Sequence, residues 1–398
     1  MLKKIPISQV RRGMFLSSIE GSWLNHSIWK LRFVINDEET LARVRSCGAA
    51  ECWIDTSQGL DVESAPPVVQ SVRAPAPTPT TGVRKSMGDE LQNAANVLKR
   101  SRTAVNSLFA EARMGNAVNT SECKPLVDDI VESVDSNADA LISLCRLKLA
   151  DEYTYMHSVS VCALMVSLGR QLGLDEATCR DAGMAGLLHD LGKAAMPQDI
   201  LNKPGKLTDD EFTIIKSHPA KGYEMLLESG VDNERVLDVA RHHHERMDGT
   251  GYPDKLAADD VSLIARMSAV CDVYDAITSN RPYKAGWDPA ESIARMASWQ
   301  GHFDPTVLQM FVKTIGIYPV GSLVRMASGK LAVVVEQNTK KLTAPKVKVF
   351  FSTRSGMPLL PKLLDLADAQ VQEKIVAREP AENWNFSYLN DLWSNHIP

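Results

Sequence analysis

Apolar residues recur at helical spacing along most of the chain beyond residue 87. The period is clear over 91–112 and 126–147, and almost every segment that follows repeats it between Gly or Pro loops. The pattern therefore predicts connecting helices over 87–149 and a helical bundle over 150–320. The connecting helices are expected to pack on the core of the bundle, with a dimerisation seam as the alternative.

Both ends of the chain have strand patterns instead. The expected strands are residues 5–7, 31–35, 52–54, 322–326, 331–335 and 347–351, with a short helix opening at Asp37 and a turn at Gly329. Residues 63–86 are rich in Pro and Ala, which predicts an extended linker. We therefore expect a multidomain, mainly α protein with a small α/β N-terminal domain at 1–62 and a small β-rich C-terminal extension at 321–398.

The composition is that of an ordinary soluble globular protein. The 398 residues are 44% hydrophobic and 23% charged, with a formal net charge of -5. This balance argues against a protein that coats DNA, which needs a basic surface. No apolar run is long enough to span a membrane, and the start lacks the apolar core of a signal peptide. Seven scattered cysteines are typical of free thiols in a reducing compartment, so a cytoplasmic location is expected.

Histidines and aspartates form a candidate metal centre in the helical region. The candidate ligands are His157, His189, Asp190, His218, His243, His244 and Asp272, which include five of the nine histidines. A single histidine is more often an ordinary core or surface residue. For the whole set that explanation fails, because burying several imidazoles and two carboxylates without a cation is costly for every unpaired charge.

Mixed His and Asp ligation suits Fe, Mn, Ni or Zn, and the lack of a thiolate argues against structural zinc. The expected division is His157, His189, Asp190 and Asp272 around one ion and His218, His243 and His244 around the other, with Asp190 bridging. A hydroxide shared by the ions would attack a phosphodiester.

His242 is left out of the candidate ligands, because adjacent helical positions point about 100 degrees apart. Asp275 is expected to orient the loop over residues 248–253, which follows the histidine pair and is called the glycine loop because it contains two glycines.

Cationic and aromatic residues near the ligands are candidates for contact with a phosphate substrate. Lys193 lies about one helical turn after Asp190, so its ammonium group can face the same site. Tyr252 belongs to a tight Gly- and Pro-containing loop that would, in isolation, be an ordinary turn. Arg281 and Lys284 are expected to clamp a phosphate, the alternative being a solvated surface cluster.

In combination these motifs resemble the HD-GYP subgroup of HD-domain phosphohydrolases. The resemblance rests on His189-Asp190-Leu191-Gly192-Lys193, Asn202-Lys203-Pro204-Gly205, His218, His243-His244-Glu245, Asp248-Gly249-Thr250-Gly251-Tyr252-Pro253, Asp272, Asp275 and Arg281-Pro282-Tyr283-Lys284. It covers roughly residues 150–320, and a combined motif of this length is highly specific. The first 60 residues resemble a small N-terminal domain that is often joined to such enzymes.

The resemblance implies an all-α HD-type catalytic core, two divalent ions with Fe or Mn favoured, and hydrolysis of cyclic di-GMP to pGpG and onward to GMP. It implies metal ligation by the seven candidate ligands and a catalytic role for Asp190 and Lys193. It implies substrate contact for Lys193, Tyr252, Arg281 and Lys284. The connecting helices over 87–149 make a homodimer one expected partner, and a diguanylate-cyclase-type protein is another.

Two questions stay open at this point. Some family members hold a third ion with a Glu one turn before the first histidine, but Tyr153 stands there and Glu152 is one place off, which favours two ions. The alternatives to cyclic di-GMP hydrolysis are a cyclic-dinucleotide sensor or scaffold with little turnover, and a phosphodiesterase for another cyclic dinucleotide such as cyclic GMP-AMP. Metals and cations contact phosphates and not bases, so the motifs leave the base identity open.

Overall fold

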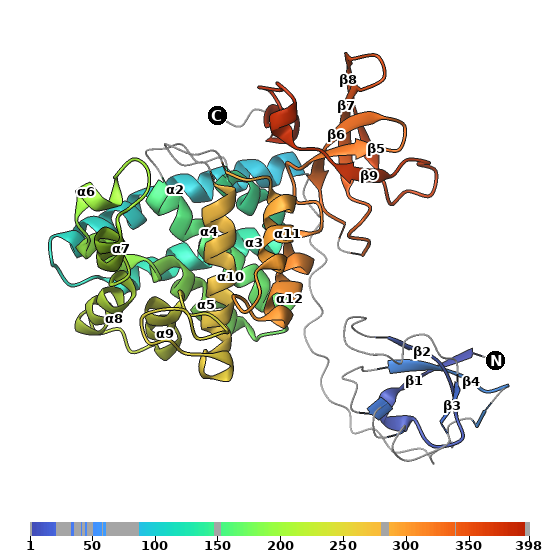
Figure 1. The fold of residues 1–398 in the computed structure, drawn as a ribbon, viewed down its shortest axis with the longest axis horizontal. Helices are drawn as coiled ribbons and strands as arrows, with labels where there is room; N and C mark the ends of the chain where they lie inside the picture. Colours follow the sequence, from blue (N-terminus) through green and yellow to red (C-terminus); the bar gives the residue numbers. More distant parts are fainter. Residues whose placement is uncertain are drawn as a thin grey trace. The chain divides into compact units, whose positions relative to one another are not determined.

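The computed structural model divides the chain into an N-terminal unit, Met1–Thr80, and a main unit, Thr81–Pro398 (Figure 1). The residues that it describes are 2–20, 33–35, 41, 44–45, 51–57, 59–60, 87–146, 153–279, 286–338 and 340–394. Each unit is treated by itself.

The N-terminal unit contains a four-stranded antiparallel sheet. Strands β1 (Leu2–Pro6), β2 (Phe15–Glu20), β3 (Phe33–Val34) and β4 (Glu51–Asp55) pair in the order β1-β4-β2-β3. The strands predicted at 5–7, 31–35 and 52–54 overlap β1, β3 and β4, whereas β2 has no predicted counterpart. Asp37, the predicted helix start, lies outside the described residues.

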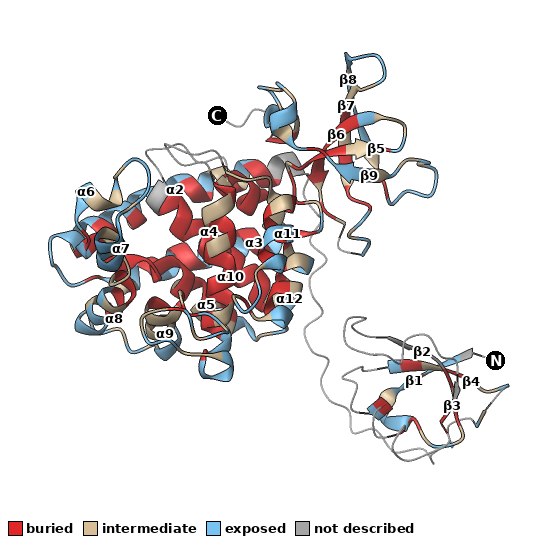
Figure 2. Cartoon of the chain, viewed as in Figure 1, coloured by how far each residue is buried: buried red, intermediate tan, exposed pale blue. Residues whose placement is uncertain are grey.

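The main unit begins with four long helices. They are α2 (Met87–Arg113), α3 (Cys123–Arg146), α4 (Tyr153–Gln171) and α5 (Glu176–Leu188). The helix α3 is kinked at Asn137, whose backbone is not helical (φ -163°, ψ 99°). All residues of α4 from Tyr155 to Gly169 are buried, as expected for a helix that is apolar around most of its circumference. Figure 2 shows that buried residues fill the interior of the helical bundle. Polar residues on α4 therefore enter the core, and His157 is one of them.

Shorter helices complete the bundle, and local signals set many of their starts. They are α6 (Gln198–Leu201), α7 (Asp209–Ile215), α8 (His218–Glu228), α9 (Glu234–His242), α10 (Leu263–Thr278), α11 (Pro289–Ser298) and α12 (Pro305–Ile315). Thr208 and Glu211 form a capping box at α7, and the side chains of Asn233 and Ser262 cap α9 and α10. Because caps act over a few residues, the starts of these helices are set by local sequence.

The C-terminal extension is a five-stranded antiparallel sheet. Its strands are β5 (Leu323–Met326), β6 (Lys330–Glu336), β7 (Lys346–Ser352), β8 (Met357–Asp365) and β9 (Ile375–Arg378), in the order β8-β7-β6-β5-β9, followed by the short helix α13 (Asp391–Ser394). The predicted meander corresponds to β5, β6 and β7, and Gly329 occupies its first turn with a φ of 77°. Leu331 and Val333 of this sheet belong to the same hydrophobic core as the helices.

The mainly helical architecture with strand-containing regions at both ends agrees with the prediction from the sequence. Among the helices of the described residues, not one is long and apolar enough to cross a membrane.

Candidate metal centre

The seven candidate ligands converge from five elements of the helical bundle. His157 lies on α4, His218 begins α8 and Asp272 lies on α10, and the other two histidines are the C-cap residues of helices, His189 of α5 and His243 of α9. The neighbours Asp190 and His244 follow His189 and His243 directly. Six of the seven are buried, and the His244 side chain is 22% exposed. The structure thus brings together residues separated by more than 100 positions in the sequence.

His189 and Asp190 lie just past the C-terminal end of α5 and not inside the helix. The helix α5 stops at Leu188, His189 is its C-cap residue, and Asp190 starts a 3-10 turn, Leu191–Ala195. At this end the backbone changes direction. As a consequence, His189 and Asp190 can both face the centre although they are adjacent.

In the first group, His157, His189 and Asp272 each place one ligand atom within 4.8 Å of the others. Asp272 Oδ1 lies 3.1 Å from His157 Nε2 and 3.8 Å from His189 Nε2. Asp190 Oδ2 lies 3.4 Å from both of these Nε2 atoms. The four residues therefore surround one position.

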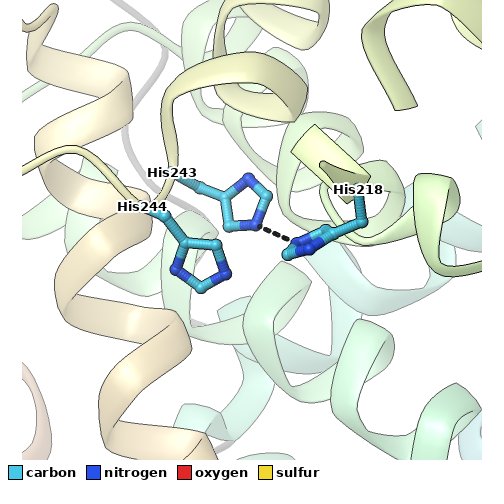
Figure 3. A group of neighbouring side chains, drawn as sticks. All are labelled: His218, His243 and His244. Carbon is cyan, nitrogen blue, oxygen red and sulfur yellow. Dashed lines mark hydrogen bonds between the residues drawn. The ribbon is translucent and has the colours of Figure 1, made fainter. Parts of the chain in front are cut away.

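The second group consists of His218, His243 and His244 (Figure 3). The Nε2 atoms of His218 and His243 are 3.2 Å apart. The other oxygen of Asp190, Oδ1, lies 3.2 Å from His218 Nε2 and 3.7 Å from His243 Nε2. One carboxylate thus faces both groups, with a different oxygen toward each.

The orientation of two rings shows that the second group fits a cation. His218 Nδ1 lies 2.7 Å from the carbonyl oxygen of Ile215, and His243 Nδ1 lies 2.9 Å from that of Val239. A carbonyl oxygen only accepts, so both Nδ1 atoms donate and both Nε2 atoms present lone pairs to each other. Such lone pairs repel unless a cation lies between them, and two nitrogen ligands about 2.1 Å from one ion would lie roughly 3.0–3.4 Å apart.

The charge state of the buried groups points the same way. Burial would raise the pKa of Asp190, but the charges of Lys193 and His189 hold that pKa well below its usual range. Burial, reinforced by His244, holds the pKa of His243 well below its usual range, so this imidazole is neutral. Within the described part of the chain, His189 Nε2 and Asp190 Oδ1 are buried without a hydrogen-bond partner. A neutral His243 and an ionised Asp190 both offer lone pairs, as the ligands of a divalent metal must.

The predicted substrate residues are placed as follows. Lys193 Nζ lies 2.5 Å from Asp190 Oδ2, with its side chain 29% exposed. The ring of Tyr252 lies against that of His244, with centroids 4.8 Å apart. Arg281 and Lys284 lie outside the described residues, so their predicted contacts stay predictions.

His242 is held away from the cluster by two aspartates. Its Nδ1 lies 2.7 Å from Asp238 Oδ1 and its Nε2 3.0 Å from Asp254 Oδ2. Both ring nitrogens therefore have carboxylate partners outside the cluster. This agrees with its omission from the predicted ligands.

One carboxylate has a role that differs from the expectation, and a second has a role that was not predicted. Asp275 contacts His157 and Ser160 and is not the residue that anchors the glycine loop. The buried Glu245 has that position, because its Oε1 accepts from the backbone N–H groups of Asp254 (2.7 Å) and Lys255 (3.0 Å) directly after the loop. The sequence contains little indication of this role, because Glu245 is recognisable only as an acidic residue that follows two candidate ligands.

Comparison with known proteins identifies the family. The HD domain profile matches residues 131–307, and a domain of unknown function, DUF3391, matches residues 2–123. A protein of Pseudomonas aeruginosa named as a cyclic di-GMP phosphodiesterase is 52% identical over 397 residues, covering 99% of this chain and 96% of the relative. This chain belongs to the HD-GYP family of HD-domain phosphohydrolases.

Other relatives match this HD-GYP protein over shorter lengths. The cyclic di-GMP phosphodiesterase response regulator RpfG of Xanthomonas campestris is 41% identical over 181 residues, covering 43% of this chain and 47% of that relative. A 3'3'-cGAMP-specific phosphodiesterase of Vibrio cholerae is 34% identical over 165 residues, covering 40% of this chain and 31% of that relative. The similarity thus extends to relatives named for two different cyclic dinucleotides.

Proposed function

We propose that this HD-GYP protein is a metal-dependent phosphodiesterase that hydrolyses cyclic di-GMP to linear pGpG, and pGpG onward to GMP. The observation that carries the proposal is the pair of ligand groups that share Asp190, with Lys193 beside it. The full-length similarity to a cyclic di-GMP phosphodiesterase supports the choice of substrate.

The two groups would hold one divalent ion each. His157, His189 and Asp272 would bind the first, His218, His243 and His244 the second, and Asp190 both. When bound, such ions supply a water that is ionised near neutral pH and positive charge against the phosphoryl oxygens. Imidazole and carboxylate ligands suit Fe or Mn, and we propose these metals.

The remaining residues would bind and orient the substrate. The ammonium group of Lys193 is exposed enough to reach a phosphate oxygen while it stays beside Asp190, and it would offset charge that develops in the transition state. Tyr252, whose ring lies against that of His244, would contact the substrate at the edge of the centre. Arg281 and Lys284 are proposed as the phosphate clamp on the basis of the family resemblance.

A direct assay tests this proposal. Purified protein loaded with Mn²⁺ or Fe²⁺ is incubated with cyclic di-GMP, and the products are separated by chromatography. We expect pGpG to form, and Asp190→Ala to lower the rate by at least about 100-fold, because both ion positions lose a ligand. His242→Gln is the matched control, since this histidine lies outside the cluster, and it should keep most of the activity. An Asp190→Ala variant with the normal rate would contradict the role of Asp190.

Two alternatives are separated by further measurements. The similarity to a cGAMP-specific enzyme makes cyclic GMP-AMP the second candidate substrate, and a competition assay across cyclic dinucleotides ranks the two by kcat/KM. Tight binding of a cyclic dinucleotide without turnover in the metal-loaded protein would favour a sensor or scaffold. A homodimer or a diguanylate-cyclase-type partner stays a prediction that size-exclusion and pull-down experiments can test.

A further inference from the structure

Four of the five ligand histidines have a close partner at Nδ1, and these partners are of two different kinds. In His189, His218 and His243, Nδ1 faces a backbone carbonyl oxygen at 2.7, 2.7 and 2.9 Å. In His157, Nδ1 lies 2.6 Å from Oδ2 of the carboxylate of Asp275. Of these four histidines, His157 has a charged partner at Nδ1, whereas the other three have neutral ones.

The carboxylate behind His157 is itself fixed. Asp275 is fully buried, and its second oxygen accepts a hydrogen bond from Ser160, one turn after His157 on α4. A buried anion that accepts from Nδ1–H raises the basicity of the imidazole and fixes the orientation of its Nε2 atom. His157 should therefore be a stronger metal ligand than a histidine held by a carbonyl.

The charges around the two positions differ in the same sense. The first position has Asp272 Oδ1 and Asp190 Oδ2 within 3.1–3.4 Å of His157 Nε2, and the charge of Asp275 behind the ring. The second position is formed by three histidines, with Asp190 Oδ1 3.2 Å from His218 Nε2 and Asp272 Oδ2 farther away, 3.8 Å from His244 Nδ1. A divalent cation gains more electrostatic energy at the first position.

We propose that the two ion positions are unequal: the His157 position fills first and holds its ion tightly, the three-histidine position exchanges, and Asp275 is the positioning residue that produces the difference. The inference rests on the two-ion centre of the proposed function. It adds an order of loading and assigns a cause to it. The concentration of free metal would then control activity, because it sets the occupancy of the weaker position.

Titration of the metal-free protein with Mn²⁺ tests the order. Free Mn²⁺ is measured by electron paramagnetic resonance, and bound metal by equilibrium dialysis. We expect two separate binding steps in the wild type. Asp275→Asn keeps the size of the side chain and one acceptor but removes the charge, and it should weaken the tight step about 10- to 100-fold while the weaker step is unchanged.

Control variants locate each step. Glu90→Gln alters another buried carboxylate that accepts from a serine, Ser136, and it should leave both steps unchanged. His218→Ala should remove the weaker step and keep the tight one. That variant leaves Asp275 intact, so the order of loading can be tested even if Asp275→Asn does not fold.

The outcomes separate the inference from the proposed function. A wild-type protein that binds no Mn²⁺ would overturn the two-ion centre itself. Two steps of equal affinity, or loss of the tight step in His218→Ala, would overturn the unequal loading while the two-ion centre stands. Equal weakening of both steps by Asp275→Asn, or no effect, would remove the role of Asp275.

Discussion

Substitution of Gly192 by alanine should damage the centre without touching any ligand. Gly192 lies in the 3-10 turn that follows Asp190 and carries Lys193. A Cβ atom on Gly192 would lie 1.9 Å from the carbonyl oxygen of His218 and 2.5 Å from the backbone nitrogen of Gly222. Both contacts are with the backbone of α8, so no side-chain rotation can relieve them.

The size of the effect follows from these distances. Real Cβ contacts shorter than 3.0 Å are essentially absent, so the turn and α8 must separate by about 1 Å. Overpacking of this kind costs about 1–3 kcal/mol of unfolding free energy. The separation would also move His218 away from Asp190, and a displacement of about 1 Å in a catalytic centre lowers the rate on the order of 100-fold.

The measurement compares Gly192→Ala with Gly169→Ala. In the control, the new Cβ would meet the Sγ atom of Cys179 at 3.1 Å, which is a side chain that can shift. Because Gly169 lies within α4, alanine there gains up to about 1 kcal/mol of helix propensity. The stability measured by urea denaturation, the affinity for Mn²⁺ and the rate of cyclic di-GMP hydrolysis should all fall in Gly192→Ala and not in Gly169→Ala. Wild-type stability, metal binding and rate in Gly192→Ala would refute the reasoning.

Three further variants test other parts of the structure. Lys193→Gln removes the cation beside Asp190 and should lower kcat about 100- to 1,000-fold, with bound metal retained; an unchanged kcat would contradict its role. Glu245→Ala leaves two backbone N–H groups without their acceptor and should cost about 1–3 kcal/mol in urea denaturation, whereas equal stability of Glu245→Ala and wild type would show that the loop is held otherwise. Arg325 lowers the pKa of Glu379, so their ion pair stabilises the fold at neutral pH and is lost as pH falls through the folded-state pKa of Glu379. The destabilisation caused by Glu379→Gln, at most about 1 kcal/mol, should therefore shrink between pH 7 and pH 3; a constant difference would contradict this account.

Local sequence patterns determine much of the helical fold. The apolar period of α4 and the caps of α7, α9 and α10 act within a few residues, so the elements follow from the sequence. The strand β9 was not predicted because its pairing with β5, about 50 residues earlier, forms only in the folded chain. Strand pairing of this kind depends on the partner and not on the segment alone.

The candidate site divides in the same way. Residue types and motif spacing were enough to select His189-Asp190, the His243-His244 pair and Asp272, because metal binding needs particular donor atoms and the motif is long. They were not enough to place Asp275, which was expected to orient the glycine loop. Asp275 instead contacts His157, 118 residues earlier in the sequence, and Glu245 accepts the backbone hydrogen bonds that hold the loop.

By itself, the sequence determined the candidate donors and much of the helices that carry them, since both are properties of short segments. Only the tertiary structure decided which nitrogen of each ring faces the centre, and that the two oxygens of Asp190 face different groups. It also decided that a carboxylate supports one ligand and carbonyls support three others. The physical reason is that these arrangements depend on the packing of α4, α5, α8, α9 and α10 against one another, and no single segment contains that information.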